Sequence, residues 1–155
     1  MARYTATVTW ERGDARFTDS RYSRAHRWRF DGGAEVPASA SPLHVPLPLS
    51  DAAGVDPEEA FVAALSSCHM LWFLAIAAKR GLVVDAYTDE AEGTMARDDR
   101  GRLAMTRVVL RPRVRYAGAA PDEGTEAAIH HESHEACYIA NSVRTEVVVE
   151  APAAV

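Results

Sequence analysis

The sequence predicts an α+β fold built as one domain over residues 1–155. Three observations support this prediction. Apolar and polar residues alternate near the start, a long apolar segment with helix-capping residues follows, and further strand-like segments come after it. Strands that are grouped, rather than alternating one by one with helices, are typical of α+β proteins. At 155 residues the chain is long enough to bury a substantial core.

The first forty residues carry the signals of three strands. Residues 3–11 place apolar or aromatic side chains at every second position, which predicts a strand with one buried face. Residues 25–39 contain two strand-like halves around an Asp-Gly-Gly turn at 31–33, the signature of a β-hairpin. Residues 41–54 contain three prolines and are predicted to form a loop.

The strongest local prediction is a helix over residues 56–80. Asp56 fits the N-cap and Pro57 the first helical position. Glu59 follows Asp56 by three residues, as in a capping box. Gly81 comes directly after a basic last turn and is expected to stop the helix.

This predicted helix is apolar on nearly all sides. A membrane span is one alternative, but Ser66, Ser67 and His69 lie at its centre and no second hydrophobic segment accompanies it. We therefore expect a buried helix and no membrane partner. In a chain of this size, covering every side of the helix requires a second subunit.

Two long strands are predicted after the helix, at residues 82–95 and 103–118, joined by a polar turn. Residues 121–142 predict a helix that runs toward Cys137, and residues 142–151 predict a last strand. Alternating arginines in the second long strand indicate a solvated face. These are Arg111, Arg113 and Arg115.

Composition excludes several classes of function. The net charge of -5 argues against a general nucleic-acid or anionic-membrane binder. No basic region followed by an apolar one opens the chain, so no export signal is expected. Two cysteines are too few for the disulfide framework of a secreted protein, which favours a cytoplasmic protein with reduced thiols.

Cys68 needs a cation if it is to react as a thiolate. It lies twelve residues after Asp56, too far from the helix start for the dipole to help. His69 points about 100° away from Cys68 on a helix, so we expect it to serve packing or a subunit contact. Arginine stays charged when buried and is the better candidate. The nearby candidates are Arg21, Arg24, Arg27 and Arg29.

Glu58 and Cys68 lie ten residues apart. On a continuous helix this separation is about 15 Å, and the two side chains point to different faces. One arginine cannot comfortably contact both. If the three act together, either the helix is interrupted or two chains contribute to the site.

A zinc site is an alternative reading of the second helix. His130, His134 and Cys137 follow one another at i, i+4 and i+7, on one helix face. Their side chains are acceptable zinc ligands. His131 and Cys68 are further candidate ligands for the same site.

Several segments resemble the OsmC/Ohr family, and its OsmC-like subgroup in particular. "DPEEAFVAALSSCH" is similar to the family's helix motif, with Asp56 in place of the usual Asn. "CYIANSVRTEV" resembles the second cysteine motif of the subgroup, and the Tyr-Ser-Arg-x-His-x-Trp and "FDGG" segments also fit it. The resemblance covers nearly the whole chain. The chain departs from many active members at His69, and at Tyr138 and Ile139, where Pro and Ser are common.

The resemblance implies antiparallel sheets around a long central helix, in an intertwined homodimer. It implies a thiol-dependent peroxidase acting on organic hydroperoxides or hydrogen peroxide. Cys68 would be the peroxidatic thiolate and Cys137 the resolving thiol, with Glu58 as the family glutamate. Arg24 would be the family arginine, and Arg21 and Arg27 are the alternatives. An external dithiol such as a lipoyl group would reduce the disulfide, and no cofactor is implied.

A third alternative is a protein that has this fold but no peroxidase activity. In that case the protein would bind a small hydrophobic ligand. Three apolar side chains of the long helix would line its pocket, although such side chains usually form plain core. They are Met70, Trp72 and Phe73.

Overall fold

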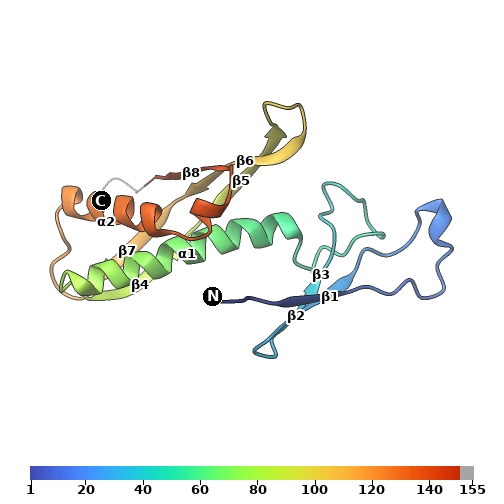
Figure 1. Cartoon of the computed structure of the whole chain (residues 1–155), viewed down its shortest axis with the longest axis horizontal. Coiled ribbons are helices and arrows are strands. Elements are labelled where there is room, and N and C mark those ends of the chain that lie inside the picture. The colour runs from blue at the N-terminus through green and yellow to red at the C-terminus, as the bar shows by residue number, and fades with distance from the viewer. Residues whose placement is uncertain (151–155) are drawn as a thin grey trace. The chain divides into compact units, whose positions relative to one another are not determined.

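A computed structural model describes residues 1–150 of the chain. The chain forms two compact units, Met1–Ala60 and Phe61–Val155. Figure 1 shows the elements of each unit. Strands and helices are grouped rather than alternating, so the α+β prediction is confirmed. The single domain expected for residues 1–155 stays a prediction.

The first unit contains one three-stranded antiparallel sheet, in the order β1-β2-β3. Its strands are β1 (Ala6–Thr9), β2 (His26–Phe30) and β3 (Glu35–Ala38). The predicted hairpin is confirmed, with Trp28 opposite Val36. The predicted burial of one face of the first strand is wrong for this chain, because all four residues of β1 are exposed.

The long helix α1 (Pro57–Lys79) begins and ends where its capping residues predict. The Glu59 backbone N–H donates to the Asp56 carboxylate at 2.7 Å, and the Asp56 N–H donates back to Glu59 at 3.2 Å. This is the predicted capping box. Gly81 follows the helix with φ of 78°, a left-handed conformation that glycine adopts without strain. The helix is continuous across its whole length.

Four strands replace the two long strands that we predicted after α1. β4 (Val84–Asp89) pairs antiparallel with β7 (Pro112–Tyr116), and β5 (Glu92–Arg97) pairs antiparallel with β6 (Leu103–Leu110). Each predicted strand is thus interrupted by one or two residues. Because of these interruptions, β4 and β7 form one sheet, whereas β5 and β6 belong to another.

The second helix and the last strand complete the second unit. α2 (Glu123–Ala136) begins at Asp122, whose carboxylate accepts the Thr125 N–H at 2.9 Å. A short 3-10 helix, η2 (Ala140–Ser142), follows, and then β8 (Glu146–Val149). β8 pairs with β6 in parallel, so the sheet β5-β6-β8 is mixed, whereas the other pairs are antiparallel.

One face of α1 lies in the core of the second unit. Its buried residues recur every four positions: Leu65, His69, Phe73 and Ala77. Leu65 packs with Val108 and Leu110 of β6, and the next two apolar residues of this face pack with Ile129 of α2. The 3.6-residue helical period accounts for this buried stripe.

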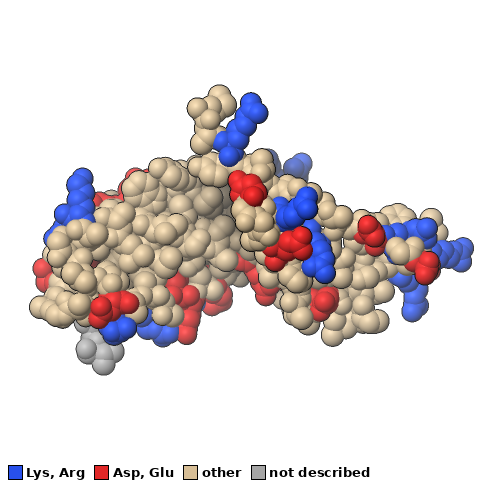
Figure 2. Space-filling view, turned by 90° about the horizontal axis from the view of Figure 1, so that it is seen from below, with Lys and Arg blue, Asp and Glu red and all other residues tan. Residues whose placement is uncertain are grey.

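Between Ala63 and Ala78, the opposite face of α1 is exposed although it carries no charge. Its residues are Ala63, Ser67, Leu71, Ala75 and Ala78. Figure 2 shows a broad surface with few charged side chains over this unit. By length and composition α1 could cross a membrane, but the core helix of a soluble protein passes the same test. The described residues contain no other such helix.

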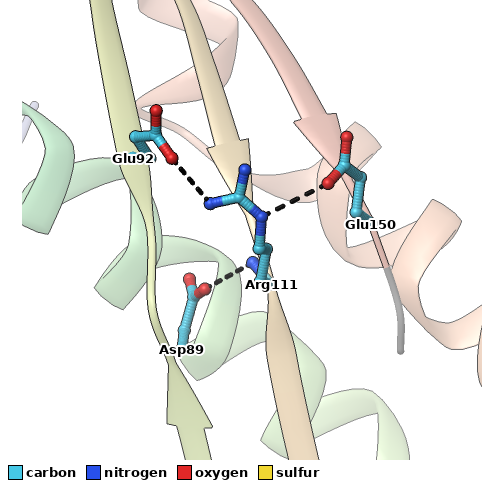
Figure 3. A network of polar contacts seen from close by, with 4 residues as sticks. All are labelled: Asp89, Glu92, Arg111 and Glu150. Atoms are coloured by element: carbon cyan, nitrogen blue, oxygen red, sulfur yellow. Dashed lines mark hydrogen bonds and ion pairs between the residues drawn. The ribbon is translucent and has the colours of Figure 1, made fainter. Parts of the chain in front are cut away.

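A polar network holds the point where β6 ends and β7 begins (Figure 3). The Arg111 guanidinium donates to Glu92 at 3.0 Å and to Glu150 at 3.3 Å. The Arg111 backbone N–H donates to Asp89 at 2.6 Å, and the other Asp89 oxygen accepts the Ser66 hydroxyl of α1 at 2.5 Å.

The solvated arginine face is confirmed. Arg113 pairs with Glu90 at 2.7 Å, and Arg115 pairs with Asp85 at 3.1 Å. With Arg111 held by its two glutamates, all three alternating arginines are neutralised within the chain. They do not form a free phosphate-binding stripe.

Candidate functional site

The two cysteines lie side by side at the interface of α1 and α2. Cys68 projects half-buried from the middle of α1, and Cys137 is 1% exposed at the end of α2. Both are free thiols, and they lie close enough for Cys68 to raise the pKa of Cys137. Spacing in the sequence could not predict this proximity, since 69 positions separate the two residues (137 − 68).

Cys137 is held where the chain leaves the helix. Its backbone is extended, with φ of -67° and ψ of 109°, and its N–H still donates to the His134 carbonyl. The Ala140 N–H donates to the Cys137 sulfur at 3.4 Å. Burial, together with the neighbouring Cys68, raises the pKa of Cys137 to about 11. Cys137 is therefore a neutral thiol near pH 7.

His69 finds its partner on the second helix. Its Nε2 lies 3.0 Å from the Nδ1 of His130, and the two rings are nearly parallel, with 9° between their planes. His130 also packs on the Phe73 ring, with 4.4 Å between ring centroids. The expectation of a packing role for His69 is thus confirmed, but the identity of its partner was not predicted.

The histidine pair is buried and neutral. Burial is the main cause that lowers the pKa of His69 to about 4, with smaller contributions from His130 and His134. Burial also lowers the pKa of His130 to about 4, against a weaker opposing effect of Asp89. The outer ring nitrogens, His69 Nδ1 and His130 Nε2, have no hydrogen-bond partner among the described residues.

The zinc alternative is wrong for this arrangement. No three His, Cys, Asp or Glu side chains in residues 1–150 converge in a way that could hold a metal ion. His130 turns toward His69, and the backbone leaves the helix at Cys137, so the helical spacing no longer applies. His130, His131 and His134 instead line a cavity of about 290 Å³ beside α2.

Arg24 is distinguished from the other candidate arginines by its burial. It is half-buried, whereas Arg21, Arg27 and Arg29 are exposed. Its guanidinium lies 3.8 Å from the centre of the Tyr22 ring and donates to the Tyr22 and Ser20 carbonyls. No carboxylate of residues 1–150 forms an ion pair with it.

Glu58 is half-buried in the first turn of α1, and within residues 1–150 it forms no ion pair either. The predicted Arg24–Glu58 pair is therefore not formed within this chain. Because α1 is continuous, the interrupted helix that could have joined Glu58 to Cys68 is excluded.

The first unit contains an aromatic cavity that was not predicted from the sequence. It has a volume of about 470 Å³, and Arg24 and His26 line it together with three aromatic rings. Trp10, Phe17 and Tyr22 form this cluster, with 4.7 Å between the centroids of the last two rings. Three aromatic residues in an otherwise polar segment are a signal that could have indicated it.

Phe73, expected as one wall of a ligand pocket, is part of the core. It is fully buried and packs with Ala77 and Ile129. Trp72, its neighbour in sequence, makes an edge contact with Tyr138 at 5.5 Å between centroids. The contacts of Phe73 agree with the plain core role, whereas the partner of Trp72, Tyr138, is 68% exposed.

Comparison with known proteins identifies relatives over nearly the whole chain. A family model described as OsmC-like protein matches residues 50–151. An OsmC-like protein of unknown function from Vibrio cholerae is 56% identical, with a TM-score of 0.95, and the match covers 97% of this chain and 99% of that one. No curated protein matches the chain.

Two more distant structures share the fold. One is an organic hydroperoxide resistance protein OsmC from Legionella pneumophila, 14% identical with a TM-score of 0.68, covering 97% of this chain and 96% of that one. The other is the organic hydroperoxide resistance protein OhrB of Bacillus subtilis, 17% identical with a TM-score of 0.63, covering 97% and 98%.

Proposed function

Because the chain belongs to the OsmC family, we propose that it is a thiol-dependent peroxidase that reduces organic hydroperoxides, and hydrogen peroxide as well. The proximity of the Cys68 and Cys137 thiols, close enough for Cys68 to raise the pKa of Cys137, is the observation that carries the proposal. One thiol is half-exposed and can meet a substrate, while the other is buried beside it. Members of the fold that are named as organic hydroperoxide resistance proteins add support.

In the proposed reaction, the thiols supply both electrons. The Cys68 thiolate attacks one peroxide oxygen, the O–O bond breaks, and the alcohol or water leaves with a proton. Cys68 becomes a sulfenic acid. The Cys137 sulfur then attacks the Cys68 sulfur, the S–O bond breaks, and water leaves as the disulfide forms. An external dithiol, such as a lipoyl group, restores both thiols by exchange. These steps require no metal, flavin or haem.

We assign Arg24 as the cation that favours the Cys68 thiolate, with Arg21 and Arg27 as the alternatives. Arg24 is half-buried and lacks an acidic partner within residues 1–150, so its charge is available to another group. Glu58 would hold Arg24 by a charge-assisted pair. Because Glu58 lies about 15 Å from Cys68 along α1, we propose that two chains build the site.

The proposed assembly is an intertwined homodimer with the two α1 helices at its centre. Two exposed apolar surfaces of the chain support this proposal. One is the uncharged outer face of α1, where Leu71 is 62% exposed, and the other is β1, where Val8 is 65% exposed. Surfaces of this kind mark interaction sites. We place the dimer in the cytoplasm, where dithiol reductants keep thiols reduced.

Peroxide consumption by the purified protein tests the proposed function. Dithiothreitol and then dihydrolipoamide serve as reductants, with cumene hydroperoxide or hydrogen peroxide as substrate. We expect Cys68→Ser to abolish turnover, and Cys137→Ser to stop after one sulfenic acid per chain. Arg113→Ala, which changes an exposed side chain paired only with Glu90, is the control. Undiminished turnover in Cys68→Ser would end the proposal.

A further inference from the structure

The aromatic cavity of the first unit contains a guanidinium that is fixed in position. The Arg24 guanidinium lies 3.8 Å from the centre of the Tyr22 ring and donates to the Ser20 carbonyl at 2.8 Å. The Arg24 backbone is fixed as well, because its N–H donates to the Leu49 carbonyl at 2.8 Å and its carbonyl accepts from His26 Nδ1 at 2.8 Å. The side chain is therefore preorganised for a ligand.

The partners of this guanidinium leave its positive charge uncompensated. The carbonyl oxygens and the ring carry no net charge, and no Asp or Glu is among the described residues that line the cavity. No ion pair within residues 1–150 includes Arg24. A guanidinium forms strong paired hydrogen bonds with a carboxylate. A phosphate group carries up to two negative charges near pH 7, whereas one arginine offsets a single charge, so a monocarboxylate is the better match.

Three aromatic rings determine what the rest of the ligand can be. Tyr22 stacks on Phe17 with 4.7 Å between centroids, and Trp10 meets Tyr22 edge-on at 5.4 Å. The indole N–H of Trp10 donates to the Ser23 carbonyl at 2.8 Å, so its polar atom is already paired. Trp10 is 38% exposed and Phe17 is 48% exposed, so a ligand can reach both rings. A flat aromatic group matches such walls, because aromatic rings attract one another in offset and edge-on arrangements.

We propose that this cavity binds aromatic monocarboxylates, with the carboxylate on Arg24 and the ligand ring against the three aromatic side chains. Its volume of about 470 Å³ lies within the range of small-molecule sites. The inference goes beyond the proposed peroxidase and does not require it. One consequence does rest on that function: a bound carboxylate occupies the guanidinium that we assign to the Cys68 thiolate, so aromatic carboxylates are expected to slow peroxide consumption.

Binding of benzoate to the reduced protein, measured by ligand-observed NMR, tests the inference without any peroxide. Benzamide has nearly the same shape without the charge, and cyclohexanecarboxylate has the charge without the aromatic ring. We expect benzoate to bind about tenfold more tightly than benzamide and about threefold more tightly than cyclohexanecarboxylate. Arg24→Gln should lose the preference for benzoate over benzamide, and Arg24→Lys should keep part of it. Arg29→Gln removes an exposed charge from β2 and, as the matched control, should keep the full preference.

Three results would overturn the inference. The first is the absence of saturable benzoate binding, as expected if a second chain covers the cavity. The second is equal affinity of the native protein for benzoate and benzamide, a comparison that needs no variant and so survives misfolding of Arg24→Gln. The third is an equal loss of preference in Arg24→Gln and Arg29→Gln, which would indicate a general effect of charge.

Failure of the proposed function gives a different result. If the native protein consumes no peroxide but prefers benzoate through Arg24, the peroxidase proposal fails and the carboxylate site stands. If peroxide is consumed and benzoate does not bind, the peroxidase proposal stands and the carboxylate site is rejected.

Discussion

Stability is expected to fall in mild acid because of the buried His69–His130 pair. The folded pKa of each ring is about 4, against an ordinary value of 6.5. Since the folded value is the lower one, the unfolded chain binds more protons between these limits, and stability falls as pH drops from about 6.5 toward 4. At pH 5 the loss relative to pH 7.5 is about 2 kcal/mol for each ring, or about 4 kcal/mol for the pair.

Urea unfolding at pH 7.5 and pH 5.0 measures this loss. The comparison is with the double variant His69→Leu/His130→Phe, which keeps the site apolar and filled. We expect the native protein to lose about 4 kcal/mol more than the variant between the two pH values. The neighbouring charged groups, His134 and Asp89, are unchanged in the variant. His44→Gln, in an exposed loop, controls for the removal of an ordinary histidine.

Equal losses in the native protein and the double variant would refute this reasoning. Proton NMR of the native protein supplies a second check that needs no variant. We expect the rings of His69 and His130 to remain neutral at pH 5. Protonation of these two rings near the ordinary histidine value of 6.5 would show that burial does not hold the pair neutral.

Three further variants test the packing and capping of the fold by urea unfolding. Gly93→Ala is expected to cost about 1–3 kcal/mol, because its Cβ would lie 2.6 Å from a β6 sulfur and from an α1 methyl group. An unchanged stability there would show that both side chains yield freely. Asp56→Ala removes the acceptor of the Glu59 N–H and should cost about 1 kcal/mol. Arg113→Ala loses only its exposed pair with Glu90 and should stay within about 0.5 kcal/mol of the native protein.

The features predicted correctly from the sequence depend on local interactions. The limits of α1 follow from Asp56, Glu59 and Gly81, all within a few residues of the helix ends. The break between β6 and β7 was missed because it involves the Arg111 N–H bonded to Asp89, 22 residues earlier. Such contacts depend on the tertiary fold and leave no periodic signal.

The same distinction explains what could be predicted of the candidate site. The cysteine motifs indicated which thiols to consider, but the proximity of Cys68 to Cys137 results from the tertiary fold. The His69–His130 bond joins residues 61 positions apart. The sequence pattern places His130 and Cys137 on one helix face. It does not show that the helix ends just before Cys137, so that this residue no longer follows the helical spacing of the metal ligands.

Three of the four polar residues in the apolar middle of α1 interact with other elements of the unit. Cys68 lies near Cys137 at the end of α2, His69 bonds to His130 in α2, and Ser66 donates to Asp89 beside the strand break. Ser67 has no such interaction: it is exposed, and its hydroxyl reaches only the carbonyl one turn back, at 3.4 Å. This contrast permits a matched test on one helix.

Ser66→Ala and Ser67→Ala gain the same helix propensity, so the difference between their free energies of unfolding reports the Ser66–Asp89 bond. A hydrogen bond to a carboxylate contributes about 1.5–3 kcal/mol, and half-burial of Asp89 lowers the expected difference to about 1–2 kcal/mol. Urea unfolding at pH 7.5 measures it. Equal stabilities of the two variants would mean that the strand break is held without the helix, by Arg111 and its acidic partners alone.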